Sequence, residues 1–456
     1  MLFRSSFSTF KPYARFKVLK ERFHHSAWEQ WPDEYKFKHR EAIERLDADE
    51  AGRMAFHEWL QWQLFHQFAD AKRHAVRRGV FLIGDLPFLV SRDSADVWAE
   101  PEFFKLDRAS GAPPDLYFAL GQRWGMPPYN WPGIAARGYE YMARKLRYAE
   151  HFYDLFRVDH FVGIFRVWTI ALTEPPESAG QRGAFDPPDE SQWAANGRAH
   201  LEAIVKNTRM LPLAEDLGVV PVCSNPTLAQ FAIPGMEVQR WTRDWEGNAD
   251  FKGPLLYRRN SVAVLSTHDM TGLFGWWRDE AGTVDAGMFR KKCPSRGVSF
   301  EKVRPKLFDP AHPVPGRLLW RPDVRDVSVL LERLGLREEQ ARDFIEMYRG
   351  SFDEKRRFRR FIGLPGEPRR QPGPELARHA ILKAHEAESV FSVQPIQDWL
   401  SLSPRFAPEA ADFRINYPGS SGPQNWTRRL PMSLEGLKAM RLDREILKLN
   451  RKAGRC

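Results

Sequence analysis

The sequence predicts an α/β protein whose strands form a parallel sheet. Three short apolar runs of strand length each end on an acidic residue, at Asp159, Glu215 and Asp269. An apolar run that stops on a charge is typical of a buried parallel strand that carries a carboxylate to the rim of the sheet. Helical stretches alternate with such runs over most of the 456 residues, which favours successive βα units that build one site.

Six strands are expected in chain order. The first begins at Val80 and runs through Gly84-Asp85, directly after a helical stretch that Gly79 is expected to stop. The last begins at Phe391, behind a long charged region. The expected strands lie near residues 80–90, 153–159, 210–215, 235–241, 261–268 and 390–397.

Helices fill most of the remaining sequence. Two stretches rich in Gly and Pro, 111–132 and 174–192, are expected to be loops instead. Helical periodicity is expected over 12–78, 138–151, 193–208, 278–388 and 432–452. The resulting division is an N-terminal helical segment 1–78, a barrel core 79–277 with the catalytic strands, an inserted helical subdomain 278–388, and a last strand with a closing segment 389–456.

Composition narrows the class of protein. Apolar residues make up 43% of the chain, which indicates a globular protein, and no run of eighteen apolar residues predicts a membrane span. The net charge of +10 is spread along the chain without a zinc-finger, RRM or KH signature, so a basic enzyme surface is favoured over nucleic-acid binding. The sixteen Trp and thirty-two Phe predict either a large aromatic core or exposed platforms that stack on sugar rings.

The cysteines favour a reducing compartment. Cys223, Cys293 and Cys456 are odd in number and have no CxxC spacing, which argues against a disulfide framework and a zinc site. The chain is therefore expected to be cytoplasmic. The first twenty residues carry basic residues such as Arg4 and no acid, as transit peptides do, but a folded helix is expected from about Pro12.

The acidic strand ends favour glycosidic chemistry. Arg157 and Asp159 are two residues apart on one strand, so their side chains point to the same side, and a fixed guanidinium keeps the carboxylate ionised as a nucleophile requires. Glu215 ends an apolar strand, where burial favours the protonated form that donates a proton. Asp269, beside His268, could bind sugar hydroxyls. The alternative is structural: a buried Arg157–Asp159 ion pair and a helix N-terminal carboxylate at Glu215.

Several motifs carry a family resemblance. They occur in the family's order over about residues 12 to 430, and the chain resembles the 4-α-glucanotransferases called amylomaltases or disproportionating enzymes, in the α-amylase clan. The matching segments are Gly84-Asp-Leu-Pro-Phe-Leu-Val-Ser-Arg-Asp93-Ser-Ala-Asp96-Val-Trp98, Gly111-Ala-Pro-Pro-Asp115, Gly121-Gln-Arg-Trp124, Arg157-Val-Asp159-His160, Ala214-Glu215-Asp216-Leu-Gly218, Thr267-His268-Asp269, Arg414-Ile-Asn416-Tyr-Pro418-Gly419 and Asn425-Trp426.

The resemblance implies a (β/α)8 TIM-type barrel with helical insertions, retaining chemistry, and α-1,4-glucans and maltooligosaccharides as substrates. It implies that Asp159 is the nucleophile, Glu215 the acid/base and Asp269 the transition-state stabiliser. No metal or organic cofactor is implied, and no nucleic-acid or membrane partner is expected. The residues expected to bind substrate are Arg157, His160, His268, Asp93, Trp124 and Asn416.

The front of the chain departs from the family. Members usually carry a segment before the first helix that holds the opening barrel strands, and the strand at 80–90 corresponds to the third in their order. The barrel is therefore expected to lack its first two strands and to leave the outer edges of the 80–90 and 390–397 strands unpaired. Alternatives to a transferase are an α-glucan hydrolase, or a catalytically weak glycan-binding protein if the absent strands disable the site.

Overall fold

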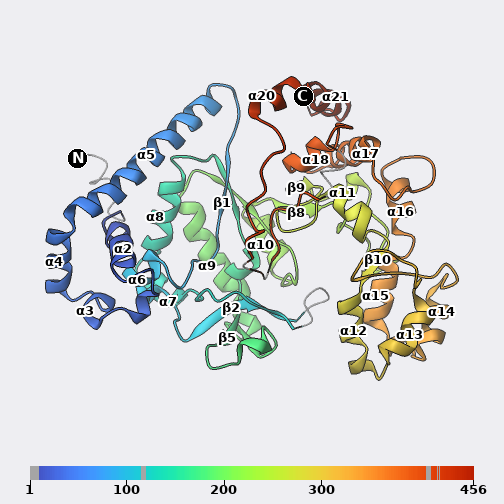
Figure 1. Ribbon diagram of the computed structural model, residues 1–456, viewed down its shortest axis with the longest axis horizontal. Coiled ribbons are helices and arrows are strands. Elements are labelled where there is room, and N and C mark those ends of the chain that lie inside the picture. The colour runs from blue at the N-terminus through green and yellow to red at the C-terminus, as the bar shows by residue number, and fades with distance from the viewer. Residues whose placement is uncertain (1–9, 115–119, 407–411, 419, 421, 456) are drawn as a thin grey trace. The chain divides into compact units, whose positions relative to one another are not determined.

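The computed structural model describes residues 10–114, 120–406, 412–418, 420 and 422–455 (Figure 1). The chain forms two compact units, which meet in sequence at Ile233 and Pro234, and residues from Leu120 to Ile233 join the N-terminal part in the first unit. The expected boundaries at 78, 277 and 388 do not coincide with this division, and the four-segment organisation stays a prediction. The predictions that concern Arg4, Asp115, Gly419 and Cys456 fall on residues outside the described ranges.

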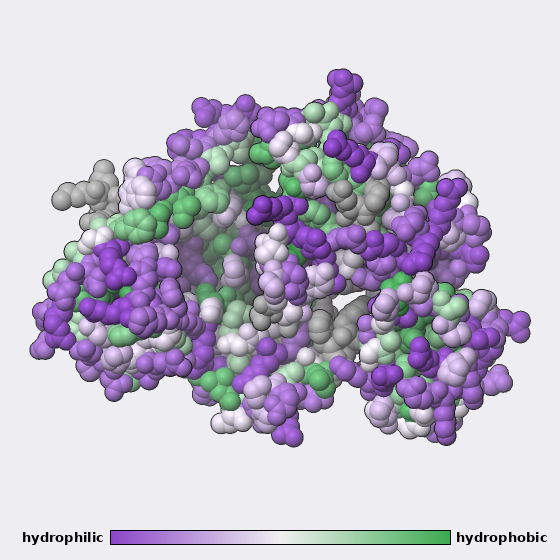
Figure 2. All heavy atoms as spheres, viewed as in Figure 1, coloured by the Kyte–Doolittle hydropathy of each residue, from purple (hydrophilic) through white to green (hydrophobic). Residues whose placement is uncertain are grey.

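The N-terminal part of the first unit is helical, as predicted. Its longest helix is α5 (Ala51–Val76), which Gly79 follows with a left-handed φ of 68°. Apolar side chains of α5 remain exposed away from its packed face, and Figure 2 shows hydrophobic residues at the surface along this helix. The exposed apolar side chains of α5 include Phe56, Leu64 and Phe68. The other helices are α2 (Phe10–Arg22), α3 (Asp33–Lys36) and α4 (Arg40–Asp49).

Three of the expected strands form a parallel sheet in the first unit. The order is β1 (Ile83–Leu86), β4 (Leu155–Val158) and β7 (Leu211–Ala214). Side chains of α8 (Glu140–Ala149) and α9 (Trp193–Lys206) share one hydrophobic core with β4 and β7, because these helices place aliphatic residues toward the sheet. The helices expected at 138–151 and 193–208 are therefore confirmed. Shorter helices are α6 (Ala95–Ala99), α7 (Trp131–Ala136) and α10 (Ser224–Gln230).

The two Gly- and Pro-rich stretches are not simply loops, and that expectation was wrong. They contribute to an antiparallel sheet in the order β3 (Gln122–Arg123), β2 (Arg108–Ala112), β5 (Val167–Ala171) and β6 (Gly183–Asp186). Glycine is required inside these strands because a Cβ at Gly183 would collide with the ring of Trp168, and one at Gly111 would collide with the carbonyl oxygen of Gln122. Residues that normally indicate turns here allow close packing.

The second unit contains the other three expected strands, again parallel. The order is β8 (Gly235–Val238), β9 (Ser261–Val264) and β12 (Phe391–Ser392). Beyond the short β12, the side chain of Gln394 continues the pairing: its Oε1 accepts the Leu265 N–H at 2.8 Å and its Nε2 donates to the Ala263 carbonyl at 3.3 Å. Helices around this sheet are α11 (Leu273–Gly275), α17 (Pro374–His385), α18 (Ile396–Leu400), α20 (Leu434–Ala439) and α21 (Leu442–Lys452).

The stretch between β9 and β12 is largely helical, as predicted. Its residues from Phe358 to Ala384 pack in one core with Leu265 and Leu400, whereas the part from Val284 to Phe352 forms a separate core. Phe289, Phe308 and Phe344 pack in that core with Trp320. A short antiparallel pair, β10 (Thr283–Asp285) with β11 (Arg317–Leu319), was not predicted. The helices are α12 (Ala286–Lys292), α13 (Phe300–Leu307), α14 (Val327–Leu334), α15 (Arg342–Ser351) and α16 (Glu354–Phe361).

The parallel sheets end at β1 and β12, as expected, but in the described part of the chain they also end at β7 and β8, so the open barrel stays a prediction. Among the described residues, β1 pairs only with β4 and β12 pairs only with β9. Helices occupy the described part of the chain before β1, and no strand is found there. In the same described ranges, no helix combines the length and the apolar character that crossing a membrane requires.

Breaking a buried ion pair in the second unit should strongly destabilise the fold. Arg243 and Glu354 are each 5% exposed and contact each other, while Glu354 Oε2 accepts the Gly282 N–H at 2.7 Å. We expect Glu354→Gln to lower the free energy of unfolding by about 3–5 kcal/mol, because it leaves the guanidinium buried without a counter-charge. Urea unfolding measures this change.

The matched control is the exposed pair of Arg40 and Glu44, four residues apart on α4. Glu44→Gln should cost less than about 0.5 kcal/mol, because water screens an exposed pair. Equal effects of the two substitutions would contradict the assigned importance of the buried pair.

Candidate active site

The candidate site of the first unit lies at the carboxyl ends of β1, β4 and β7. The strand register places Asp85 beside Arg157, and Val158 beside Ala214. The next residue of each of the two latter strands is acidic, Asp159 and Glu215. Because side chains alternate along a strand, Asp159 projects to the same side as Arg157, and neighbouring strands bring the two acids to the same edge of the sheet.

One guanidinium joins three carboxylates at this edge. Arg157 Nη1 donates to Asp85 Oδ1 at 2.8 Å and to Asp159 Oδ1 at 3.1 Å. Its Nη2 lies 3.1 Å from Glu215 Oε2, an ion-pair distance. The predicted Arg157–Asp159 contact is therefore present, and the same arginine also contacts Glu215. From the sequence, no role was assigned to Asp85. Its position near the end of an expected strand was the only sign that it could contact Arg157.

The charges around Arg157 are strongly coupled. Its side chain is only 12% exposed, and burial alone would lower its pKa. The negative charges of Glu215, Asp85 and Asp159 outweigh that effect, so the pKa of Arg157 is raised. The guanidinium therefore stays charged and holds the carboxylates in a fixed arrangement. A purely structural ion pair would leave turnover intact in Asp159→Asn, whereas a catalytic centre would not.

The turn after β4 brings His160 to Glu215. The backbone N–H of His160 donates to Glu215 Oε2 at 2.7 Å, and His160 has a left-handed φ of 43°, which is uncommon for a residue with a side chain. Its ring lies edge-on to Trp124 with centroids 4.8 Å apart. Burial, with a smaller effect of the Arg166 charge, lowers the pKa of His160 to about 4, so the ring is neutral at neutral pH.

A second buried histidine makes the first unit sensitive to acid. The ring of His200 stacks on Trp131 with centroids 3.8 Å apart, and burial lowers its pKa to about 4. Because the folded-state pKa lies below the unfolded value of about 6.5, the unfolded chain binds more protons between pH 4 and 6.5. Stability should therefore fall as pH falls through that window.

His200→Gln should reduce the slope of the unfolding free energy against pH. The reduction corresponds to at most about one bound proton fewer in the difference between unfolded and folded states. The free energy of unfolding, measured in urea at pH 4.5, 5.5 and 6.5 on both proteins, checks this. The exposed His39 provides the control, since His39→Gln should leave the slope unchanged. A wild-type stability that is flat over the window would contradict the assignment.

Asp93 makes its hydrogen bonds with residues outside the Arg157 network. Its Oδ2 accepts a hydrogen bond from Lys20 Nζ at 2.6 Å, and its Oδ1 accepts the Trp28 N–H at 3.2 Å. These contacts fasten the loop after β1 to the N-terminal helices. The role of Asp93 in sugar binding stays a prediction.

The remaining predicted residues form a second group, in the second unit. Asp269 Oδ1 accepts a hydrogen bond from Asn416 Nδ2 at 2.7 Å, and Asp269 Oδ2 lies 3.3 Å from His268 Nε2. The backbone N–H of Asn416 also donates to the His268 carbonyl at 3.1 Å. The structure therefore brings together Asp269, His268 and Asn416, which come from segments far apart in sequence.

Two further residues support this second group and were missed. Arg414 donates to the Asp269 carbonyl at 3.4 Å and to Thr271 Oγ1 at 3.2 Å. The ring of Trp426, which is 64% exposed, lies 5.1 Å from that of His268, between centroids. Both residues were quoted in motifs without a role, because a single sequence does not reveal which distant loop they contact.

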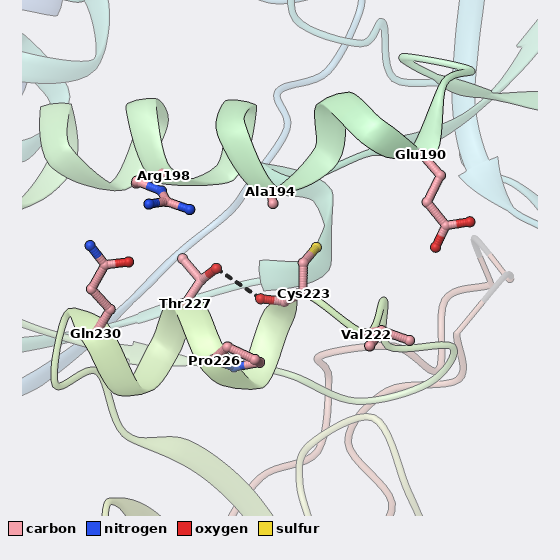
Figure 3. A pocket seen from close by; sticks show the side chains of 8 residues that line it. All are labelled: Glu190, Ala194, Arg198, Val222, Cys223, Pro226, Thr227 and Gln230. Carbon is pink, nitrogen blue, oxygen red and sulfur yellow. Dashed lines mark hydrogen bonds between the residues drawn. The ribbon is translucent and has the colours of Figure 1, made fainter.

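A pocket on the first unit lies elsewhere. It is a hollow of about 420 Å³ between α9 and α10, and Figure 3 shows Arg198 and Gln230 near one end and Glu190 near the other. Cys223 also lines it, and burial raises the pKa of that thiol, which makes it a poor nucleophile. None of the predicted site residues lines this pocket.

Paired carboxyl groups are the groups with which most enzymes that process glycosidic bonds act, and barrel enzymes carry their catalytic residues at the carboxyl ends of parallel strands. Comparison with known families agrees. The 4-alpha-glucanotransferase family model matches residues 3–434, and the chain belongs to this family.

Relatives of known name support the same family. A 4-alpha-glucanotransferase of Chlamydia caviae is 31% identical over 427 residues, which are 93% of this chain and 65% of the relative. One of Thermus thermophilus is 32% identical over 288 residues, 61% of this chain and 55% of the relative. The chain thus spans about 65% of the length of the chlamydial relative.

Solved structures support the fold. The amylomaltase from Streptococcus agalactiae in complex with acarbose matches with a TM-score of 0.68 and 23% identity, covering 99% of this chain and 74% of that one. The amylomaltase from Corynebacterium glutamicum matches with a TM-score of 0.61 and 21% identity, covering 96% and 54%. The chain is therefore an α/β protein with the fold of these amylomaltases.

Proposed function

We propose that this protein is a 4-α-glucanotransferase that moves α-1,4-glucan segments between maltooligosaccharides with retention of configuration. The observation that carries the proposal is the contact of one guanidinium, Arg157, with both Asp159 and Glu215 at the ends of neighbouring parallel strands. A retaining mechanism needs two carboxyl groups with different roles, close enough to act on one glycosidic bond. Family membership supports the choice of an α-glucan as the donor.

The mechanism has two displacements. In the first, a carboxylate oxygen of Asp159 attacks the anomeric carbon while Glu215 donates a proton to the leaving glycosidic oxygen. This gives a covalent glycosyl-enzyme and a shortened sugar. In the second, Glu215 takes the proton from a hydroxyl of an acceptor sugar, whose oxygen displaces Asp159 from the anomeric carbon. Two inversions at that carbon give overall retention.

The first displacement requires a protonated Glu215, and the contacts of this residue bear on that requirement. The His160 N–H and the Arg157 guanidinium both stabilise its ionised form. A general acid must carry a proton when the donor bond breaks, so the mechanism requires the protonated form of Glu215 in the complex with the donor.

The other predicted residues act on the sugar. Asp269 would stabilise the transition state through sugar hydroxyls, with its carboxylate held by Asn416 and His268. His160 and Trp124 would line the sugar site beside Glu215. Arg157 and Asp93 complete the proposed set of substrate-binding residues.

The proposed enzyme has a barrel architecture, a domain division and a cellular location that go with this function. The parallel strands would belong to a (β/α)8 TIM-type barrel with helical insertions, in which β1 takes the third position. The four-segment division into 1–78, 79–277, 278–388 and 389–456 is part of this proposal. The reaction uses no metal or organic cofactor, and the proposed location is the cytoplasm.

Incubation with maltotriose tests the function. We expect glucose together with maltooligosaccharides longer than maltotriose, separated by chromatography, and no such products from Asp159→Asn. Glucose and maltose without longer products would identify a hydrolase instead. Retention on a glycogen column without any turnover would identify a glycan-binding protein and overturn the proposal.

A further inference from the structure

The loop that carries His268 and Asp269 is fixed at both ends by one buried carboxylate. It connects β9 to α11 in the second unit. Ser266 Oγ donates to Asp398 Oδ2 at 2.7 Å, and the Leu273 N–H donates to Asp398 Oδ1 at 2.9 Å. Asp398 lies on α18 and is 1% exposed, so these bonds are shielded from competing water.

The loop also packs closely on the segment that carries Asp398. A Cβ placed on Gly272 would lie 3.2 Å from Asp398 Oδ1 and 3.4 Å from Gln397 Cγ, so the backbone of the loop rests on α18 with little room to shift. Just before the loop, the Leu265 N–H is bound by Gln394. The segment from Gln394 to Asp398 therefore holds the loop before and after the two site residues.

We propose that Asp398 is a positioning residue that fixes where the Asp269 carboxylate stands during glycosyl transfer. This inference rests on the proposed function and on the role assigned there to Asp269. Asn416 holds the Asp269 side chain directly, whereas Asp398 fixes the backbone on either side of it. Two anchors on one rigid group leave the intervening residues few alternative conformations, which keeps the site preorganised.

The buried position of Asp398 suits a residue that positions the loop better than one that acts on the substrate directly. Burial raises its pKa, and the hydrogen bonds from Ser266 and Leu273 and the charge of Arg240 only partly oppose that effect. A buried group with a raised pKa is disfavoured as an ion, so its contribution to stability is lost as pH rises through the folded-state pKa. Asparagine keeps an acceptor for the Leu273 N–H and can donate to Ser266, so it should retain both anchoring hydrogen bonds.

The experiment compares Asp398→Ala, Asp398→Asn and Ser266→Ala with wild-type enzyme on maltotriose. We expect Asp398→Ala to lower kcat by about 10- to 100-fold, because a small displacement of a catalytic group has effects of that size. KM should change much less, since Asp269 is proposed to act mainly in the transition state. Asp398→Asn should retain most of kcat, and Ser266→Ala should give an intermediate loss.

A stability control separates positioning from general damage. Phe344→Leu, in the separate core of the helical region, should lower the melting temperature without changing kcat. Hydrogen exchange gives a readout without substrate: the amides of residues 266–273 should exchange faster in Asp398→Ala and unchanged in Asp398→Asn. If Asp398→Ala does not fold, Ser266→Ala carries the same comparison.

The two proposals fail in different ways. A wild-type protein that forms no longer maltooligosaccharides overturns the proposed function. If the wild-type protein is active and Asp398→Ala leaves kcat unchanged, the proposed role of Asp398 is wrong. If Asp398→Ala does not fold, an unchanged kcat in Ser266→Ala leads to the same conclusion. A loss of kcat in Asp398→Asn as large as that in Asp398→Ala overturns it as well.

Discussion

Asp159→Asn is expected to reduce glucan transfer to below about a few per cent of the wild-type rate, because the amide cannot form the covalent glycosyl intermediate. The substitution keeps the size of the side chain and leaves Arg157 in contact with Asp85 and Glu215. The fold should therefore survive. Initial rates with maltotriose measure the loss, and circular dichroism during heating checks that the protein still unfolds cooperatively.

Glu215→Gln should cause a comparable loss for a different reason. The amide can still accept the His160 N–H, but it can neither donate nor accept the proton that each displacement requires. A maltosyl fluoride donor distinguishes the two roles, because fluoride leaves without a proton. Glu215→Gln should release fluoride in a burst of about one equivalent per enzyme, because only the first displacement no longer needs a proton, whereas Asp159→Asn should release none. Either variant keeping more than about a few per cent of turnover on maltotriose would remove that residue from its assigned role.

Arg157→Lys is the second substitution with a large expected effect. Arg157 contacts Asp85, Asp159 and Glu215 at once, which a planar guanidinium with five donors allows. A lysine keeps the positive charge but has a single ammonium, so it cannot hold all three carboxylates in place. We expect kcat to fall by about 100-fold, the size of effect that follows a misplacement of about 1 Å.

The matched control is Arg40→Lys, at an exposed arginine that forms an ion pair with Glu44. It should leave the kinetics and the melting temperature unchanged, since exposed pairs contribute little. If Arg157→Lys behaves like this control, then the arginine has only a packing role and the nucleophile is positioned by other groups.

The local sequence pattern determined where the parallel strands lie and which strand ends carry acidic residues. Short, mostly apolar runs that stop on an acidic residue are visible in the sequence, and β4 and β7 lie where those runs predict. The alternation of side chains along a strand likewise predicted the contact of Arg157 with Asp159. Helical periodicity located α8 and α9 for the same reason, because it repeats within a few residues.

Only the tertiary structure decided which distant residues complete these groups. Asp85 reaches Arg157, Asn416 reaches Asp269, and Asp398 reaches Ser266, and each pair is separated by dozens of residues or more. No local periodicity records such contacts, because they depend on how strands are ordered and how loops return. The antiparallel sheet was missed for a related reason: Gly111 and Gly183 are needed where backbones and rings pack closely, a requirement that the chain alone does not distinguish from a turn.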